Sequence, residues 1–325
     1  MNTHGHHHHH HHTPSHAEKV LTQMSRHWGD RAQVKSVEYD LDLVYDEKRD
    51  DFLPDLIPLQ GHPDYDEYFG DFRSKVLAGG WIIYNEKTID IEARIVSPVC
   101  TDLIYKDIPC QDHELIRFAA SETLVDESYH ILMVVNAMMI CKSKRGFNDM
   151  NLTGFSLTEK MNHEIAMAEH DWQKRIIRLG TSIVSEVFIS DYLSLLSDDK
   201  TIQPINRLTT HAHKQDELAH SGLFKTFSKQ IFAGFSEKQK RYFTEFLPKP
   251  INWFASREMN VWNQMLKQAG FPHADKIIAE SREEHGDVDL SRIDYSELIG
   301  LADEIGLLDT AIGRESFIRE GIMES

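Results

Sequence analysis

Two copies of the pattern D-E-x-x-H constrain the fold of this chain more than any other feature of its sequence. The first runs from Asp126 to His130 and the second from Asp216 to His220. On an α-helix, Glu at position i and His at i+3 lie on one face, so each copy presents an oxygen and a nitrogen to the same point. A single Glu-x-x-His arises about once by chance in a chain with this many histidines. Two copies, each preceded by Asp, indicate two helices that face a shared metal site.

The rest of the sequence predicts long helices rather than alternating strands and helices. After an irregular stretch through Asp71, helices are expected over 80–97 (ending before Pro98), 113–144, 156–197, 204–235, 236–247 and 252–270, and in a shorter C-terminal region. No glycine-rich phosphate loop or nucleophile elbow is present. The predicted fold is all-α, a ferritin-like four-helix bundle core with additional N- and C-terminal helices.

The helix before each D-E-x-x-H offers a further carboxylate. Glu92 lies thirty-five residues before Glu127, and Glu186 lies thirty-one before Glu217, at similar depths in their helices. Both stand in apolar stretches, IDIEARIV and TSIVSEVFIS, where an unpartnered carboxylate is costly. One Glu from each of two helices and a Glu-x-x-His from each of two others is the ligand set of carboxylate-bridged di-iron bundles. Iron or manganese suits such mixed carboxylate and imidazole ligands.

A third histidine extends the second copy. At about 100° per residue, His213, Glu217 and His220 fall at roughly 0°, 40° and −20°, whereas His211 lies on about the opposite side. We therefore expect His213 to be a metal ligand, although a histidine hydrogen-bonded near the site is an equal alternative from its position alone. The ion near His213 and His220 would then have two imidazoles, and its neighbour only His130.

The aspartates of the two copies have a structural and a functional interpretation. Each is either ordinary surface charge or the acceptor of the free ring N–H of a ligand histidine, plausibly one from the opposite half of the bundle. We expect Asp126 and Asp216 to act in the second way.

Composition and targeting signals limit the remaining classes of function. Lys and Arg total 35 against 52 Asp and Glu, a net charge of −17, which disfavours nucleic acid and anionic membrane surfaces. Three cysteines without a CxxC indicate a reducing compartment, and the longest apolar run is too short to span a bilayer, so we expect a cytoplasmic protein. Residues 1–16 are interpreted as a disordered affinity tag with its scar, and 17–325 as one helical domain that carries the di-iron site.

The complete ligand pattern resembles the di-iron arylamine N-oxygenases typified by p-aminobenzoate N-oxygenase. The resemblance rests on Glu92, the D-E-x-x-H at 126–130, Glu186 and the run His213-x3-Glu217-x2-His220. It covers the helical body from about residue 71 to 292, and the additional His213 separates this family from ribonucleotide reductase small subunits, desaturases and ferritins. It implies oxidation of an amine to a hydroxylamine, nitroso or nitro product, with O₂ as cosubstrate. It also implies that Arg292 contacts a substrate carboxylate.

The resemblance also leads to expectations about the substrate and the protein partners, and other functions remain as alternatives to it. The substrate is expected to be a small-molecule or carrier-protein-bound amine. The electrons are expected from an external donor of the ferredoxin or reductase type, because no flavin or nicotinamide fingerprint is present. We also expect a homodimer. The alternatives are another carboxylate di-iron oxidase or hydroxylase, a ferritin-like metal-binding protein, and a helical interaction protein that binds no metal.

Overall fold

The computed structural model describes residues 13–36, 45–110 and 113–325, and within them the fold is all-α. These residues contain no β-strand, only two isolated bridges. The helices are α2 (His16–Arg31), α3 (Gln33–Ser36), η2 (Pro54–Leu56), α4 (Pro63–Ile91), η3 (Glu92–Val96), α5 (Ser97–Ile104), α6 (His113–Arg145), α7 (Ser156–Met167), α8 (Asp171–Ser197), α9 (Pro204–Ala233), α10 (Glu237–Phe246), α11 (Lys249–Phe254), α12 (Met259–Gln268), α13 (Ala274–His285), η4 (Leu290–Arg292), α14 (Ser296–Glu304), η5 (Leu307–Asp309) and α15 (Ala311–Arg319).

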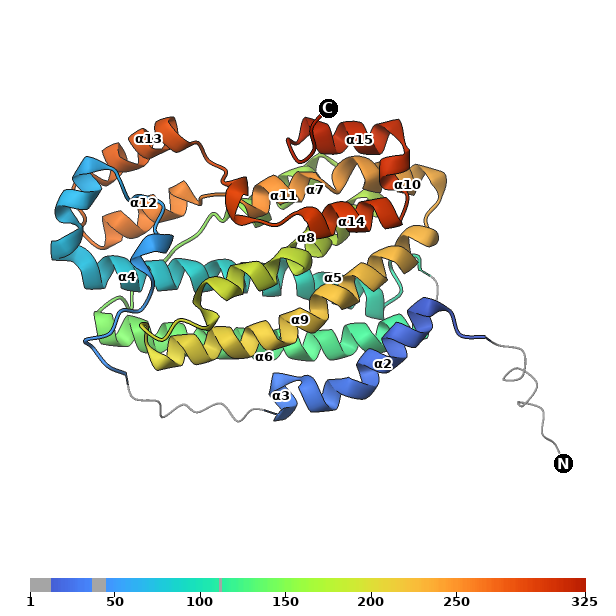
Figure 1. Cartoon of the computed structure of the whole chain (residues 1–325), viewed down its shortest axis with the longest axis horizontal. Coiled ribbons are helices and arrows are strands. Elements are labelled where there is room, and N and C mark those ends of the chain that lie inside the picture. The colour runs from blue at the N-terminus through green and yellow to red at the C-terminus, as the bar shows by residue number, and fades with distance from the viewer. Residues whose placement is uncertain (1–12, 37–44, 111–112) are drawn as a thin grey trace.

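Four long elements form the bundle that the sequence predicts. They are α4 with its continuation through η3 and α5, then α6, α8 and α9 (Figure 1). The N-terminal helices α2 and α3 pack against α6 and α9, and the C-terminal helices lie along the other side of the bundle (Figure 1). The core is built largely from apolar side chains of these helices, with Trp81, Phe188 and Phe224 among the largest fully buried ones. The predicted ferritin-like core with added terminal helices is confirmed.

The first bundle helix is longer than predicted at both ends. It begins at Pro63 rather than at Gly80, within the stretch that was predicted to be irregular through Asp71. It also runs on past Pro98 to Ile104, so the predicted end before Pro98 is wrong. The reason is the π-helical segment η3, in which the Ser97 N–H bonds back to the Glu92 carbonyl. Pro98 then falls in the first turn of α5, where its missing N–H leaves no hydrogen bond unmade. Such π segments often mark functional sites, and this one carries Glu92.

Two other predicted helices are interrupted by side chains that contact the backbone. The predicted helix over 156–197 divides into α7 and α8, because Gln173 Oε1 accepts the N–H groups of Glu169 and His170, each at 3.0 Å. The predicted helix over 252–270 divides into α11 and α12 at Glu258, whose φ of 55° is left-handed. The Glu258 carboxylate accepts the Ser156 N–H at the start of α7. The predictions of one continuous helix over 156–197 and of another over 252–270 are therefore wrong.

The N-terminal segment assigned to the tag lies mostly outside the described residues. Of 1–16, the structure describes Thr13 to His16. Ser15 caps α2 by accepting the Glu18 N–H, so the helix begins at His16.

Two bundle helices, α6 and α8, are long and apolar enough to cross a membrane by length and composition alone. In the structure 72% of the most apolar window of α8 is buried, against 44% of that of α6, which exposes Phe118, Leu132 and Met139. Each also carries a fully buried carboxylate, Glu127 or Glu186. The apolar character of α8 is that of a core helix.

Candidate metal centre

The four bundle elements bring all seven predicted ligands together at mid-bundle. η3 supplies one, α6 two, α8 one and α9 three, and each is at most 1% exposed: Glu92, Glu127, His130, Glu186, His213, Glu217 and His220. These polar side chains face one another because each occupies the inward stripe of an otherwise apolar helix face.

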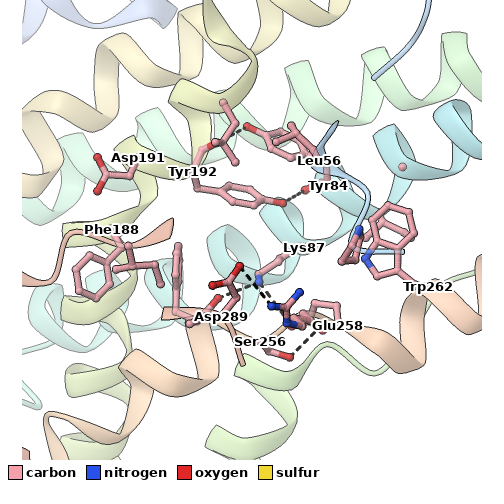
Figure 2. Close-up of a pocket in the computed structure, with 18 of the residues that line it drawn as sticks. Leu56, Tyr84, Lys87, Phe188, Asp191, Tyr192, Ser256, Glu258, Trp262 and Asp289 are labelled. Atoms are coloured by element: carbon pink, nitrogen blue, oxygen red, sulfur yellow. Dashed lines mark hydrogen bonds and ion pairs between the residues drawn. The ribbon is translucent and has the colours of Figure 1, made fainter. Parts of the chain in front are cut away.

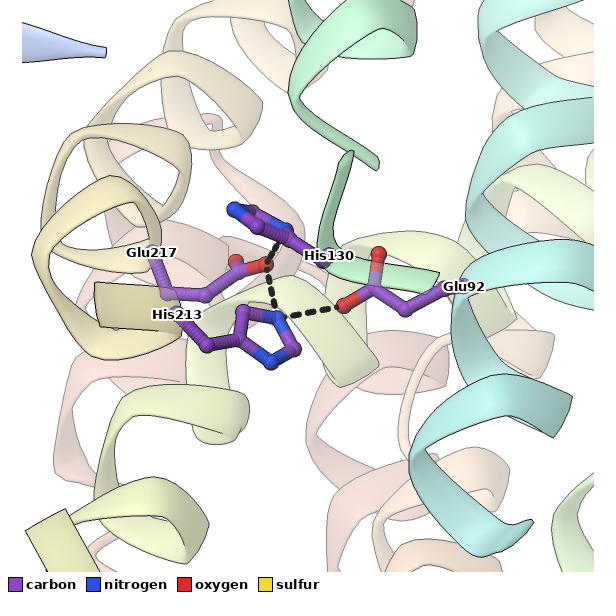
Figure 3. Close-up of side chains that lie close together, drawn as sticks. All are labelled: Glu92, His130, His213 and Glu217. Carbon is purple, nitrogen blue, oxygen red and sulfur yellow. Dashed lines mark hydrogen bonds and ion pairs between the residues drawn. The ribbon is translucent and has the colours of Figure 1, made fainter. Parts of the chain in front are cut away.

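The seven residues form two groups, each able to hold one ion with ligand atoms within 4.8 Å of one another. One group contains Glu92, His130, His213 and Glu217 (Figure 3). The other contains Glu127, Glu186, Glu217 and His220. Glu217 belongs to both, which is the position of a bridging carboxylate.

The distribution of imidazoles differs from the predicted one. His213 shares its group with His130, and their ring centroids are 4.0 Å apart, whereas His220 lies in the other group. The side-chain positions therefore differ from the predicted arrangement, in which His213 and His220 serve the same ion. Which ion each imidazole binds stays a prediction.

The buried ligand atoms fit a pair of cations. Eight of these atoms have no hydrogen-bond partner: Glu92 Oε2, Glu127 Oε1 and Oε2, His130 Nδ1, Glu186 Oε1 and Oε2, Glu217 Oε2 and His220 Nδ1. Such unpartnered buried groups are rare in proteins and individually costly. His220 Nδ1 lies only 2.9 Å from Glu127 Oε1, so a proton or a cation must lie between the two atoms. A metal ion would take the place of that proton.

The two aspartates fix the orientation of the ligand histidines, each across the bundle. His130 Nε2–H donates to Asp216 Oδ2 at 2.6 Å, and His220 Nε2–H donates to Asp126 Oδ2 at 2.8 Å. Because the Nε2 atoms carry these protons, the Nδ1 atoms turn their lone pairs to the cluster. The placement is the cross-bundle one expected from the sequence.

Residues at the N-terminus of the fold donate hydrogen bonds to the two aspartates, and the sequence analysis did not predict these contacts. Arg31 bridges the two aspartates, with Nη1 3.1 Å from Asp216 Oδ1 and Nη2 3.2 Å from Asp126 Oδ2. Trp28 Nε1–H donates to Asp126 at 3.0 Å, and the Gln33 N–H donates to Asp216 at 3.1 Å. The sequence offered one indirect signal for these contacts. Each aspartate carboxylate has two oxygens, and if one accepts a histidine N–H, the other needs a different donor.

Charge and burial make the site dependent on cations. Six carboxylates, four of glutamate and two of aspartate, are fully buried here, and Arg31 is the cation that contacts them. Burial raises the pKa of Glu186 well above its usual range, and the charges of Glu217 and Glu127 add to the effect. Burial alone would lower the pKa of His130, but its bond to Asp216 and nearby carboxylates raise it to about 9. Metal uptake therefore displaces protons from this cluster.

Two further residues were singled out in the sequence. His211 is half exposed on the other side of α9, where its Nδ1 lies 3.6 Å from Asp198. The side chain of Arg292 is outside the described residues, although its backbone belongs to η4.

A cavity of about 160 Å³ lies beside the same two helices that carry Glu92 and Glu186. Six of its lining residues are aromatic: Phe52, Tyr84, Phe188, Tyr192, Phe254 and Trp262. Figure 2 shows Tyr84, Phe188, Tyr192 and Trp262 among them. Tyr84 and Tyr192 stack with their centroids 4.4 Å apart. None of the seven cluster residues lines the cavity, and at about 100° per residue Phe188 and Tyr192 lie roughly on the opposite side of α8 from Glu186.

A helical bundle that buries paired carboxylate and imidazole groups in this way defines a ferritin-like di-metal protein. More specifically, the chain belongs to the P-aminobenzoate N-oxygenase AurF family, whose model matches residues 14–306. It is 29% identical over 293 residues to the 4-aminobenzoate N-oxygenase of Streptomyces thioluteus, a match that covers 89% of this chain and 87% of that protein. The chain is thus a monooxygenase of the N-oxygenase type, and the predicted family is confirmed.

Replacing either aspartate tests its role in holding a ligand histidine. Asp126→Asn and Asp216→Asn should each weaken metal affinity by about 10–100-fold, because the amide orients the imidazole less firmly. Competition with a chelator of known affinity measures this loss. Asp198→Asn is the matched control, since Asp198 faces the half-exposed His211 rather than a cluster histidine. Wild-type affinity in both test variants would contradict the role.

Proposed function

We propose that the protein oxidises the nitrogen of a small aromatic amine, using two iron ions, O₂ and electrons from an external donor. In the first oxidation the amine, O₂, two electrons and two protons give the hydroxylamine and water. Further rounds would give nitroso or nitro products. The observation that carries this proposal is the buried carboxylate and imidazole cluster in a chain that belongs to the N-oxygenase family. A cavity of about one-ring size between α4, α8 and the C-terminal helices adds to it.

The residues divide between the two proposed iron positions. Glu92, His130 and His213 would hold one ion, Glu127, Glu186 and His220 the other, and Glu217 both. When bound, such a centre supplies the binding and reductive activation of O₂. The protein supplies the geometry: Asp126 and Asp216 fix the ligand imidazoles, and complete burial excludes bulk water.

The size of the cavity favours a single aromatic ring. An engineered cavity of about 150 Å³ lined by apolar side chains binds benzene. At about 160 Å³, the cavity here has room for one ring with a small substituent. The aromatic wall supplies apolar surface and ring–ring contacts for such a substrate.

The cavity is lined by charged as well as aromatic side chains. Lys87 Nζ lies 3.6 Å from Glu258 Oε1, and Arg257 Nη2 lies 3.7 Å from Asp289 Oδ2. Asp289 and Ile293, on either side of η4, both line the cavity. This placement supports the proposal that Arg292 binds a substrate carboxylate, as would suit the substrate named for the Streptomyces thioluteus relative.

The experiment is product analysis with an amine panel. Tag-free protein loaded with iron and chemically reduced is given O₂ and, separately, an aryl amine with a ring carboxylate, an unsubstituted aryl amine, an aliphatic amine and a carrier-bound aminoacyl group. We expect O₂ uptake proportional to the one-ring aryl amine and a product with a new N–O bond. Products hydroxylated only on carbon would contradict N-oxygenation. O₂ uptake unaffected by any amine would indicate a ferritin-like ferroxidase instead.

A further inference from the structure

The proposed reaction needs a path for electrons into a closed site. Each N-oxygenation consumes two electrons, yet all seven cluster residues are at most 1% exposed. A donor at the surface therefore cannot touch the cluster. Electron transfer through protein slows steeply with distance, and hydrogen bonds carry it better than gaps between atoms.

One hydrogen-bonded chain of side chains leads from the surface to the cluster. Trp28, which is partly exposed on α2, donates Nε1–H to Asp126 Oδ1 at 3.0 Å. The other oxygen of Asp126 accepts His220 Nε2–H at 2.8 Å. The opposite ring nitrogen of His220, Nδ1, faces Glu127, Glu186 and Glu217 at 2.9–3.4 Å. Two hydrogen bonds thus connect an outer indole ring to the ligands of one ion position.

The other aspartate of the site, Asp216, has no tryptophan among its described hydrogen-bond donors. Asp216, which holds His130, receives its other hydrogen bonds from Arg31 and from the backbone N–H of Gln33. A guanidinium and an amide orient the carboxylate as well as an indole does, so orientation alone does not explain why Asp126 has a tryptophan. Among the described partners of the two aspartates, the indole is the one group able to relay electrons.

We propose that electrons reach the centre through Trp28, Asp126 and His220, from a one-electron iron–sulfur donor that approaches the α2 side. The proposal rests on the proposed function, because only an oxygenase needs this supply. Each reduced donor gives one electron and becomes oxidised, so two donors serve one turnover. Together with two protons from solvent they balance the transfer of one oxygen atom to nitrogen and the release of the other as water.

The test measures reduction of the iron centre without any amine. Oxidised, iron-loaded, tag-free protein is mixed anaerobically with a reduced [2Fe–2S] ferredoxin as probe, and the loss of ferric absorbance is followed by stopped flow. Trp28→Phe should reduce at least about tenfold more slowly than wild type. Trp28→Tyr, which restores a redox-active ring and a hydroxyl donor, should recover much of the rate. Trp172→Phe is the matched control, because Trp172 packs against Tyr242 rather than an aspartate of the site.

Two accompanying measurements separate electron transfer from a structural role. Iron content is measured in every variant and each reduction rate is expressed per bound iron, because Trp28 also donates a hydrogen bond to Asp126. In a single turnover of chemically pre-reduced protein no electron needs to pass Trp28, so product per bound iron in Trp28→Phe should fall far less than its reduction rate. A wild-type reduction rate per bound iron in Trp28→Phe would overturn the proposal, and so would a loss of single-turnover product as large as the loss of rate. Because the reduction assay contains no amine, absence of N-oxygenated product from wild-type protein would refute only the proposed function.

Discussion

Glu217→Ala is expected to empty both metal positions and to lower amine oxidation by at least about 1,000-fold, which corresponds to about 4 kcal/mol in the activation barrier. Glu217 is the one residue common to both ligand groups, and its Oε1 atom lies 3.0 Å from His213 Nε2. Removing it leaves each group with three ligands and deletes the carboxylate that bridges them. The loss should therefore exceed that from replacing a ligand of a single group.

Metal analysis and product assay on the same preparation measure this effect. Glu283→Ala is a suitable control, since Glu283 is exposed on α13, far along the chain from the cluster. Circular dichroism confirms that the helices remain. Two metal ions per chain in folded Glu217→Ala protein would contradict the shared position of this carboxylate.

The second large effect distinguishes two histidines only two residues apart. His213→Ala should weaken or remove one ion, the one also held by Glu92 and His130, whereas His211→Ala should leave both ions in place. His213 is 1% exposed and points into the cluster, while the side chain of His211 is 50% exposed. We expect at least about a 100-fold difference in affinity for the weaker ion, or about 3 kcal/mol.

Calorimetric metal titration of the two metal-free variants makes the comparison directly. The variants differ only in which side of α9 loses an imidazole, so effects on expression or helix propensity are matched. Equal affinities, or a greater loss in His211→Ala, would show that His213 does not belong to the site.

The helix periodicity explains why the residues of the cluster were predictable. An α-helix fixes which residues share a face, so the spacing in D-E-x-x-H and in the run from His213 to His220 selects inward side chains without a structure. Periodicity says less about how far along the bundle axis a residue of one helix lies from a residue of another helix. The sequence therefore did not indicate that the ring of His213 lies 4.0 Å from that of His130, which comes from another helix.

Features set by long-range contacts were not predictable in the same way. The break between α7 and α8, and the left-handed Glu258 between α11 and α12, lie in stretches whose local composition favours helix. Arg31 and Trp28 contact aspartates 95 to 185 residues away, and nothing in the sequence of α2 marks them. The π segment at Glu92 likewise depends on how the whole helix packs, so Pro98 misled the prediction.

The central claim is that this bundle holds two metal ions at the buried cluster. The direct measurement is the metal content of tag-free protein after iron loading and removal of excess, by inductively coupled plasma mass spectrometry with protein quantified by amino-acid analysis. The histidine run at residues 6–12 must be removed because these side chains bind metal themselves. We predict close to two iron ions per chain. Fully helical, iron-supplemented protein that retains no metal would contradict the claim.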